Sequence, residues 1–353
     1  MIKKTSLADI AASLGVSKTL VSLVLNDKAD RYGISRETQT RVRERIAELN
    51  YRPDALARVF RTGKTLNIGL LVPDISNVFC AAMARSIEKK AWEHAYSLVI
   101  CSTQDNPDRE NKQIRNLLDK RVDGLIISSS QQNPGVFNAL SEEGFPHVLI
   151  DRTYKDMRSP SVSTDNFWGA SMVAGHFLEQ GFRHMAMVFV AAEHLSAIND
   201  RIMGFTSALS AAGVEIPSRW KIRVPLNDAA GTIEAQLNGL KQAGNMPEAI
   251  FALNHRLTSD CLLSLRKLNL DIPGEVALAG FDDMPWFALT RPSVTAVRQP
   301  LETIGEQAFN LLKRQMNQTD RKGMEASVHL PVELIIRESS VIRASQPAKQ
   351  HLP

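Results

Sequence analysis

Residues 6–26 contain two short apolar repeats separated by a glycine, and this spacing constrains the amino-terminal fold more than any other feature. Apolar residues recur three or four positions apart from Leu7 to Leu14, which predicts a helix with one apolar face. Gly15 lets the backbone reverse, and the Ser17 hydroxyl can accept a free amide of a second helix. The pattern predicts a helix-turn-helix.

The second predicted helix has an apolar side and a polar side. Val21 and Val24 fall on the apolar side, while Lys18, Thr19 and Ser22 remain exposed. Short or polar side chains of this kind reach base edges and phosphates when a helix lies in the major groove. The pattern favours DNA binding over the alternative, an ordinary helical hairpin in which the glycine is only a connector.

A third helix is predicted from Ser35 to about Leu49, and its apolar residues can close a three-helix core. Pro53 suits the first turn of a further helix at about residues 54–61. Because so short a helix is marginal in water by itself, we expect a hinge that is ordered on DNA and loose otherwise.

The two parts of the chain differ in net charge. Residues 1–64 hold 13 Lys and Arg against 7 Asp and Glu, a net charge of +6, whereas the whole chain carries +4, which leaves −2 for residues 65–353. A basic head on a slightly acidic body is typical of a protein that contacts phosphate at one end.

Composition narrows the class of protein. With 353 residues the chain exceeds one ordinary core, so two or three domains are expected. A hydrophobic content of 44% is typical of a soluble protein, and we find no apolar run of the ~20 residues that a membrane helix needs and no signal peptide. Three widely spaced cysteines favour neither disulfides nor a zinc site, so we expect a cytoplasmic protein without metal or cofactor.

From residue 65 onward, apolar strands alternate with helical stretches. Strands are expected at residues 68–72, 98–100, 124–127 and 147–150, and again at 185–190, 249–253 and 276–280. This alternation predicts two parallel sheets built from βαβ units, joined near residues 160–165. Ligands of such sheets lie at the carboxyl ends of the strands, so the cleft between the sheets is the expected site for a small polar molecule.

The whole chain up to about Arg337 resembles the lactose/galactose repressor (LacI/GalR) family. The matching segments follow one another in order: Leu7-Ala-Asp-Ile-Ala, Gly15-Val-Ser, Leu49-Asn-Tyr-Arg-Pro53, Val122-Asp-Gly-Leu-Ile-Ile127, Ile150-Asp-Arg152, Thr164-Asp-Asn166, Arg201-Ile-Met-Gly-Phe205, Ala279-Gly-Phe-Asp-Asp283 and Pro292-Ser-Val-Thr-Ala-Val297. One such match would be weak, but the ordered set is specific.

The resemblance implies an all-α helix-turn-helix head and an α/β body, like periplasmic binding proteins, with two doubly wound parallel-sheet lobes that interleave in sequence. The implied domains are a DNA-binding head, a hinge and linker, a ligand-binding and dimerisation body, and a flexible tail, at residues 1–50, 51–64, 65–340 and 341–353. Within the body the expected lobes comprise residues 65–161 with 293–323, and 162–292 with 324–340.

The family also implies which residues contact DNA. Lys18 and Thr19 match its major-groove readers, and phosphate contacts match Ser17, Ser22 and Asn26. The remaining predicted DNA contacts are Ser6, Leu23, Tyr51, Ala57 and Phe60.

Two of these contacts depart from the family pattern. Leu23 replaces a basic reader and could favour a thymine methyl, and Phe60 replaces a leucine wedge. Phe60 could instead pack against a second subunit. Additional sequence between Lys28 and Gly33 is a further departure.

In the body, the matched ligand-side residues are Asn77, Phe79, Ser128, Arg152, Asp165, Arg201, Asn254 and Asp282. Carboxylates, amides and guanidinium groups bind sugar hydroxyls in pairs, and an aromatic face can cover a sugar ring. His255 stands where the family often has an aspartate, which would suit an acidic sugar, a phosphorylated sugar or simple packing.

These residues imply a transcriptional regulator, in most relatives a repressor, that binds a palindromic DNA operator as a homodimer or tetramer and responds to a small-molecule effector, a carbohydrate in the family pattern. A ligand-dependent activator, or a corepressor-type regulator that senses a non-sugar metabolite, is the alternative. A transport binding protein would lack the basic head, and no catalytic motif indicates an enzyme. No membrane partner is expected.

Overall fold

The computed structural model describes residues 6–49, 51, 63–226, 228–317 and 327–342. It divides the chain into one unit of residues 1–65 and a second of residues 66–353. Each unit has a hydrophobic core of its own.

The first unit is helical. Its elements are α1 (Leu7–Leu14), α2 (Lys18–Leu25), the 3₁₀ turn η1 (Asp30–Tyr32) and α3 (Arg36–Glu48). Each α-helix begins at a serine, Ser6, Ser17 or Ser35, whose hydroxyl accepts the amide hydrogen of the third residue after it. Gly15 ends α1 in the left-handed region at φ +65°, as the sequence predicts.

The core of this unit is formed by side chains from all three helices. Ile10, Val21, Val24 and Val42 are at most 1% exposed, and Ala29 from the α2–α3 connection joins them. The predicted three-helix core is therefore present. The hinge predicted at residues 54–61 lies outside the described residues.

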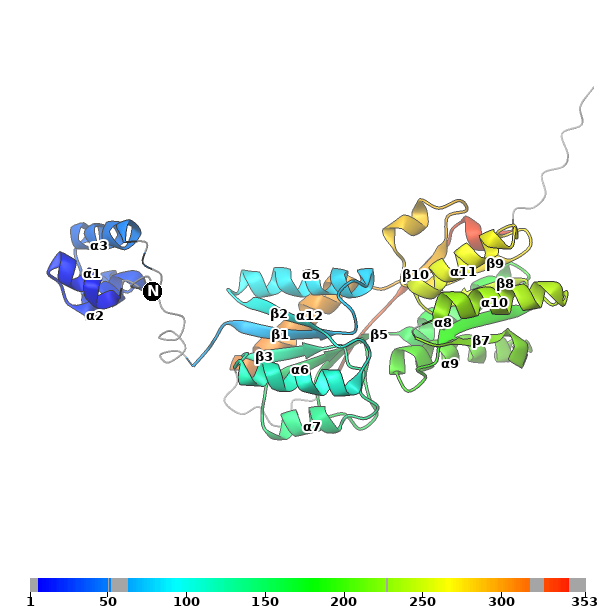
Figure 1. The fold of residues 1–353 in the computed structure, drawn as a ribbon, viewed down its shortest axis with the longest axis horizontal. Helices are drawn as coiled ribbons and strands as arrows, with labels where there is room; N and C mark the ends of the chain where they lie inside the picture. Colours follow the sequence, from blue (N-terminus) through cyan, green and yellow to red (C-terminus); the bar gives the residue numbers. More distant parts are fainter. Residues whose placement is uncertain (1–5, 50, 52–62, 227, 318–326, 343–353) are drawn as a thin grey trace, which may run out of the picture. The chain divides into compact units, whose positions relative to one another are not determined.

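The first lobe of the second unit is a six-stranded sheet in the order β11-β5-β4-β3-β1-β2, with every neighbouring pair parallel. Helices α5 and α12 cover one face and α6 and α7 the other (Figure 1). The strands are β1 (Asn67–Val72), β2 (Ser97–Ser102), β3 (Gly124–Ile127), β4 (His147–Ile150), β5 (Ser161–Thr164) and β11 (Ser327–Leu330). The helices are α5 (Val78–Glu93), α6 (Pro107–Asp119), α7 (Gly135–Glu142) and α12 (Leu301–Asn317).

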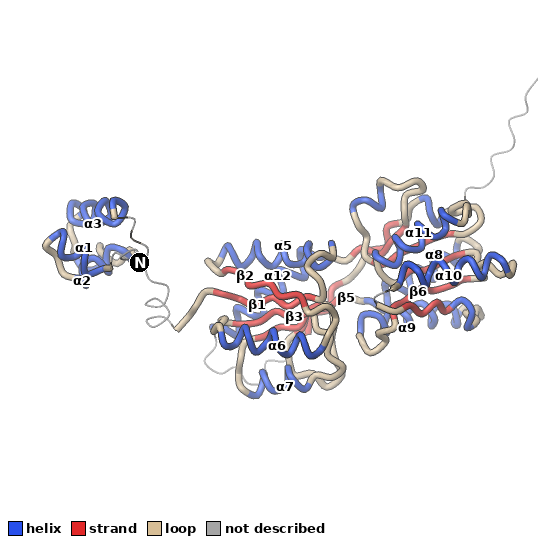
Figure 2. Tube along the Cα trace, in the orientation of Figure 1, coloured by secondary structure: helices blue, strands red, loops and turns tan. Residues whose placement is uncertain are grey.

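The second lobe repeats this plan in the order β12-β10-β9-β8-β6-β7, parallel except for β12 at the edge. Its strands are β6 (Met185–Val190), β7 (Lys221–Val224), β8 (Ala249–Ala252), β9 (Ala277–Phe281), β10 (Thr295–Arg298) and β12 (Glu333–Ile335). Its helices are α8 (Asn166–Glu179), α9 (Ser196–Ala211), α10 (Ala229–Gln242) and α11 (His255–Lys267), with 3₁₀ turns η2 (Ser218–Trp220), η3 (Pro285–Ala288) and η4 (Glu338–Ser340). In both lobes the sheet lies between helices (Figure 2).

Within the described residues the chain crosses between the two sheets three times, and these crossings differ from the predicted lobe boundaries. They follow β5, β10 and β11, not residues 161, 292 and 323. β5 pairs with β4 and β11 pairs with β5, so both strands belong to the first sheet, although residues 162–164 and 327–330 were predicted in the second lobe. β10 pairs with β9 and belongs to the second sheet, although it was predicted in the first lobe. The predicted boundaries came from the family resemblance, because the strands expected from the apolar pattern did not include β5, β10 or β11.

No single helix among the described residues is long and apolar enough to span a membrane. Only α1 and α2 taken together reach that length and composition, and they are bent by 110° at the turn between them.

The contact between α8 and α9 generates a stability prediction. A Cβ at Gly204 of α9 would collide with the backbone carbonyl of Phe167 on α8. We expect Gly204→Ala to lower the free energy of unfolding by about 1–3 kcal/mol, because two backbones would have to separate. Urea unfolding followed by circular dichroism measures the change.

Gly239→Ala in α10 is the matched control, since nothing lies within 4 Å of its Cβ position. It should raise the unfolding free energy by about 0.5–1 kcal/mol through the usual helix preference for alanine. Equal midpoints for the two variants would contradict the close α8–α9 packing.

Candidate functional site

The outer side of α2 presents the residues predicted to read DNA. Lys18 and Thr19 are exposed in its first turn. Ser22, Leu23 and Asn26 follow on the same side one and two turns later and are half-buried. The Asn26 amide donates to the Ser22 carbonyl at 2.6 Å, which fixes its position at the end of the helix.

The other predicted DNA contacts are distributed differently. The hydroxyls of Ser6 and Ser17 cap α1 and α2. Tyr51 is half-buried and packs against the core of the first unit. Ala57 and Phe60 lie outside the described residues.

A cavity of about 160 Å³ lies between the two lobes, at the carboxyl ends of their strands. The structure brings seven of the eight predicted ligand-side residues to its wall: Asn77, Phe79, Ser128, Arg152, Arg201, Asn254 and Asp282. Asp165 is not part of the wall; its carboxylate accepts the Trp168 amide at 2.8 Å and caps α8. A larger hollow of about 840 Å³, beside Phe182 and Ile272, contains none of the predicted residues.

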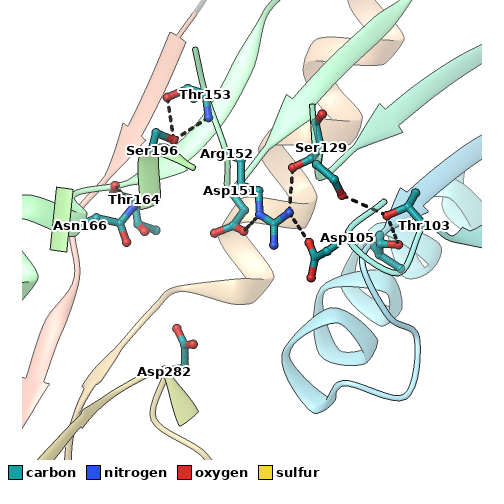
Figure 3. Close-up of polar contacts among 12 residues, drawn as sticks. Thr103, Asp105, Ser129, Asp151, Arg152, Thr153, Thr164, Asn166, Ser196 and Asp282 are labelled. Carbon is teal, nitrogen blue, oxygen red and sulfur yellow. Dashed lines mark hydrogen bonds and ion pairs between the residues drawn. The ribbon is translucent and has the colours of Figure 1, made fainter. Parts of the chain in front are cut away.

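The first-lobe wall is organised around Arg152, the second residue after β4. Its Nη1 donates to Asp105 Oδ1 at 2.7 Å and to the Ser129 carbonyl at 2.8 Å (Figure 3). Next to it, the Thr153 amide donates to Ser196 Oγ at 2.8 Å, a direct hydrogen bond from the first lobe to α9 of the second. The guanidinium group therefore lies in a fixed position beside an interlobe contact.

The second-lobe wall holds a second buried guanidinium. Arg201 of α9 donates through Nε to Asn166 Oδ1 at 2.8 Å and through Nη1 to the Leu253 carbonyl at 2.7 Å. Its Cζ lies 3.7 Å from the centre of the Phe281 ring. Five-per-cent exposure and these contacts leave it one orientation, toward Asp282.

Asp282 of the wall contacts three polar side chains. Its Oδ1 accepts from Gln299 Nε2 at 2.6 Å and lies 3.7 Å from Arg201 Nη2, and His255 Nδ1 is 3.4 Å from its Oδ2. Burial raises the pKa of this carboxyl, but Arg201 and His255 more than offset that effect and hold the pKa below its usual value. Asp282 is therefore ionised.

Gln299 connects this carboxylate to the crossings between the lobes. It follows β10, and its Oε1 accepts the Thr164 hydroxyl at 2.7 Å, at the end of β5. One buried amide thus joins the wall of the cavity to two of the three crossings. Sequence reasoning did not identify Gln299, because a single glutamine after a strand carries no pattern.

Sequence reasoning also missed Asp151. It follows β4 as Asp282 follows β9, and both residues have left-handed backbones, with φ +67° and +70°. Burial raises the pKa of Asp151, and its Oδ2 lies 3.7 Å from Arg152 Nε. The shared signal, an aspartate directly after a buried strand, was present in the sequence.

The cavity presents fixed donors and acceptors from both lobes. Asn77 and Asn254 use their carbonyl oxygens to cap α5 and α11, and in the described part of the chain their amide nitrogens have no hydrogen-bond partner. With the carboxylates of Asp151 and Asp282, this set matches a ligand whose hydroxyls both donate and accept hydrogen bonds.

Comparison with known proteins identifies the family. Residues 6–54 match the family "bacterial regulatory proteins, lacI family", and residues 174–340 match the periplasmic binding protein-like domain. The HTH-type transcriptional regulator KdgR of Bacillus subtilis is 30% identical over 336 residues, covering 95% of this chain and 97% of the relative. The chain belongs to the LacI family. It is a DNA-binding transcriptional regulator and not an enzyme.

Solved structures of LacI-family proteins share its fold. The lac repressor dimer bound to operator and the anti-inducer ONPF matches 96% of this chain and 100% of that chain, with a TM-score of 0.84 at 20% identity. A periplasmic binding protein/LacI transcriptional regulator from Alkaliphilus metalliredigens, complexed with D-xylulofuranose, matches 78% of this chain and 99% of that chain, with a TM-score of 0.68 at 29% identity. The predicted fold class is confirmed.

The Asp282–Gln299 contact generates a pH prediction for this LacI-family chain. Gln299→Glu would place a second carboxyl against Asp282 in a buried site, which raises the pKa of the introduced carboxyl above its unfolded value of about 4.3. A raised pKa in the folded state means stability that declines as pH increases through this window. We expect the unfolding midpoint of the variant, relative to that of the wild type, to decrease as the pH is raised from about 5 to about 8.

Gln242→Glu, at the exposed end of α10, makes the same chemical change and should show no such decline. A Gln299→Glu variant whose stability follows that of Gln242→Glu at every pH would disprove the buried contact.

Proposed function

We propose that this regulator is a repressor that binds a palindromic operator as a homodimer, and that a sugar or sugar derivative in the interlobe cavity controls its affinity for DNA. The supporting observation is the wall of the cavity, where Arg152, Arg201 and Asp282 converge from both lobes in fixed orientations. We assign the DNA-binding head, the hinge and linker, the ligand-binding body and the tail to residues 1–50, 51–64, 65–340 and 341–353 of a cytoplasmic protein.

On the DNA side, Lys18 and Thr19 read base edges, and Leu23 contacts a thymine methyl. Ser17, Ser22 and Asn26 bind phosphates and fix the register of α2 in the groove. Phe60 enters the minor groove as an apolar wedge. Ser6, Tyr51 and Ala57 complete the interface.

On the effector side, the ligand contacts the seven wall residues and Asp151, and Asp165 remains a predicted contact at the lobe crossing. An effector changes DNA affinity only as far as it binds one arrangement of the lobes more tightly than another. A change in the arrangement of the lobes would act on two interlobe contacts, the Thr153–Ser196 hydrogen bond and the Gln299 bridge to Thr164.

Selection of genomic fragments by the full-length protein, at a stated near-physiological salt concentration and with or without pooled sugars, tests this function. A palindrome enriched only without sugars supports an inducible repressor. Enrichment only with sugars would indicate a corepressor, and no selected sequence under either condition would contradict operator binding.

Single variants separate the two sites. Lys18→Ala should weaken operator binding by about 1–3 kcal/mol at each half-site through loss of a base contact, whereas Lys112→Ala, at an exposed position of α6, should not. Asp282→Asn should keep operator affinity and lose the sugar response, and Asp119→Asn, also on α6, should keep both. Fluorescence anisotropy on the selected operator, with and without the active sugar pool, measures both effects.

A further inference from the structure

The connection between α2 and α3 forms a compact turn. It begins where the Lys28 amide donates to the Leu23 carbonyl at 2.9 Å, against the end of α2. It closes where the amides of Tyr32 and Ile34 both donate to the Ala29 carbonyl, at 3.1 and 3.0 Å. Ala29 is 2% exposed, so the turn is anchored in the core of the first unit.

A buried glutamine braces this turn. Gln39 of α3 is 7% exposed, and its Nε2 donates to Asp30 Oδ1 at 2.7 Å and to the Ile34 carbonyl at 2.9 Å. Gly33 supplies the left-handed backbone at φ +68° that the reversal requires. The shape of the turn is therefore determined before any partner binds, and little ordering is left for binding to accomplish.

The acidic and basic side chains of the turn differ in their contacts. Asp27 pairs with Arg43 at 3.0 Å, and Asp30 accepts from Gln39. Lys28 and Arg31 are exposed and have no partner among the described residues, and Tyr32 is 61% exposed with its hydroxyl available as a donor. The exposed tip therefore offers two cations and a phenol to an anionic partner.

The position of the turn at the end of α2 indicates which anion. The eight residues of α2 span about 12 Å, and the major groove is about 12 Å wide. With Lys18 and Thr19 reading base edges at the amino end, the carboxyl end of the helix reaches the phosphate wall. We propose that Lys28, Arg31 and Tyr32 bind the phosphate backbone of duplex DNA there and extend the footprint of the head. The placement of α2 in this argument rests on the proposed function.

The test is the salt dependence of DNA binding by the full-length protein, measured on the selected operator and on a mixed-sequence duplex that requires no operator. Each lost phosphate contact should reduce the slope of log affinity against log salt by about 0.9. Because both subunits of the proposed homodimer lose the contact, Arg31→Ala should lose ~1.8 and Lys28→Ala with Arg31→Ala ~3.6 on both probes. Arg41→Ala, an exposed residue of α3 with the same charge loss, should leave the slope unchanged.

A charge-neutral variant tests whether the shape of the turn matters. Gln39→Leu removes the brace but keeps every charge, so it should weaken binding to both probes. If thermal melting shows that this variant does not fold, Tyr32→Ala replaces it, with the same expected loss.

Equal slopes for Arg31→Ala and Arg41→Ala would overturn the inference, because the cation would then contribute only net charge. If Lys18→Ala nevertheless weakens operator binding, the proposed function is still supported, and only the assignment of phosphate contacts to the turn is wrong. If Lys18→Ala binds the operator as wild type does, the placement of α2 itself fails.

Discussion

The buried carboxylate of Asp282 is the interaction on which the arrangement of the body depends. A buried charge is tolerated only when it is paired and hydrogen-bonded, and Arg201 and Gln299 supply these contacts. Each partner is itself fixed elsewhere, Arg201 by Asn166 and the Leu253 carbonyl and Gln299 by Thr164. The contacts that compensate this buried charge thereby connect α9, the crossing strands and the cavity in one hydrogen-bond network.

The first lobe also contains a buried carboxyl group, which is stabilised by a separate set of hydrogen bonds. Glu110 of α6 is fully buried and accepts from Ser129 Oγ at 2.7 Å and from the Ser130 amide at 2.6 Å. Burial raises the pKa of this carboxyl, although the two hydrogen bonds favour its ionised form. Since Arg152 donates to the Ser129 carbonyl, the loop after β3 holds both the glutamate and the arginine of the cavity wall.

The sequence predicted those parts of the molecule that depend on local pattern. Helix periodicity and serine caps located α1, α2 and α3, and apolar runs located the central strands, because these signals arise within a few residues of chain. Partnerships over long sequence separations were not predictable: β11 pairs with β5 across more than a hundred and sixty positions, and Gln299 contacts Thr164 across 135 positions. The Gln299 bridge and the position of β11 in the first sheet were missed for this reason.

The last two strands impose an order on how the protein can be made. β11 completes the edge of the first sheet and β12 the edge of the second, although both lie within residues 327–335. During synthesis on the ribosome, one edge of each sheet therefore remains unpaired until residues 327–335 have emerged. Neither lobe can finish folding co-translationally before the other, and a nascent chain arrested before residue 327 exposes two open sheet edges to its neighbours.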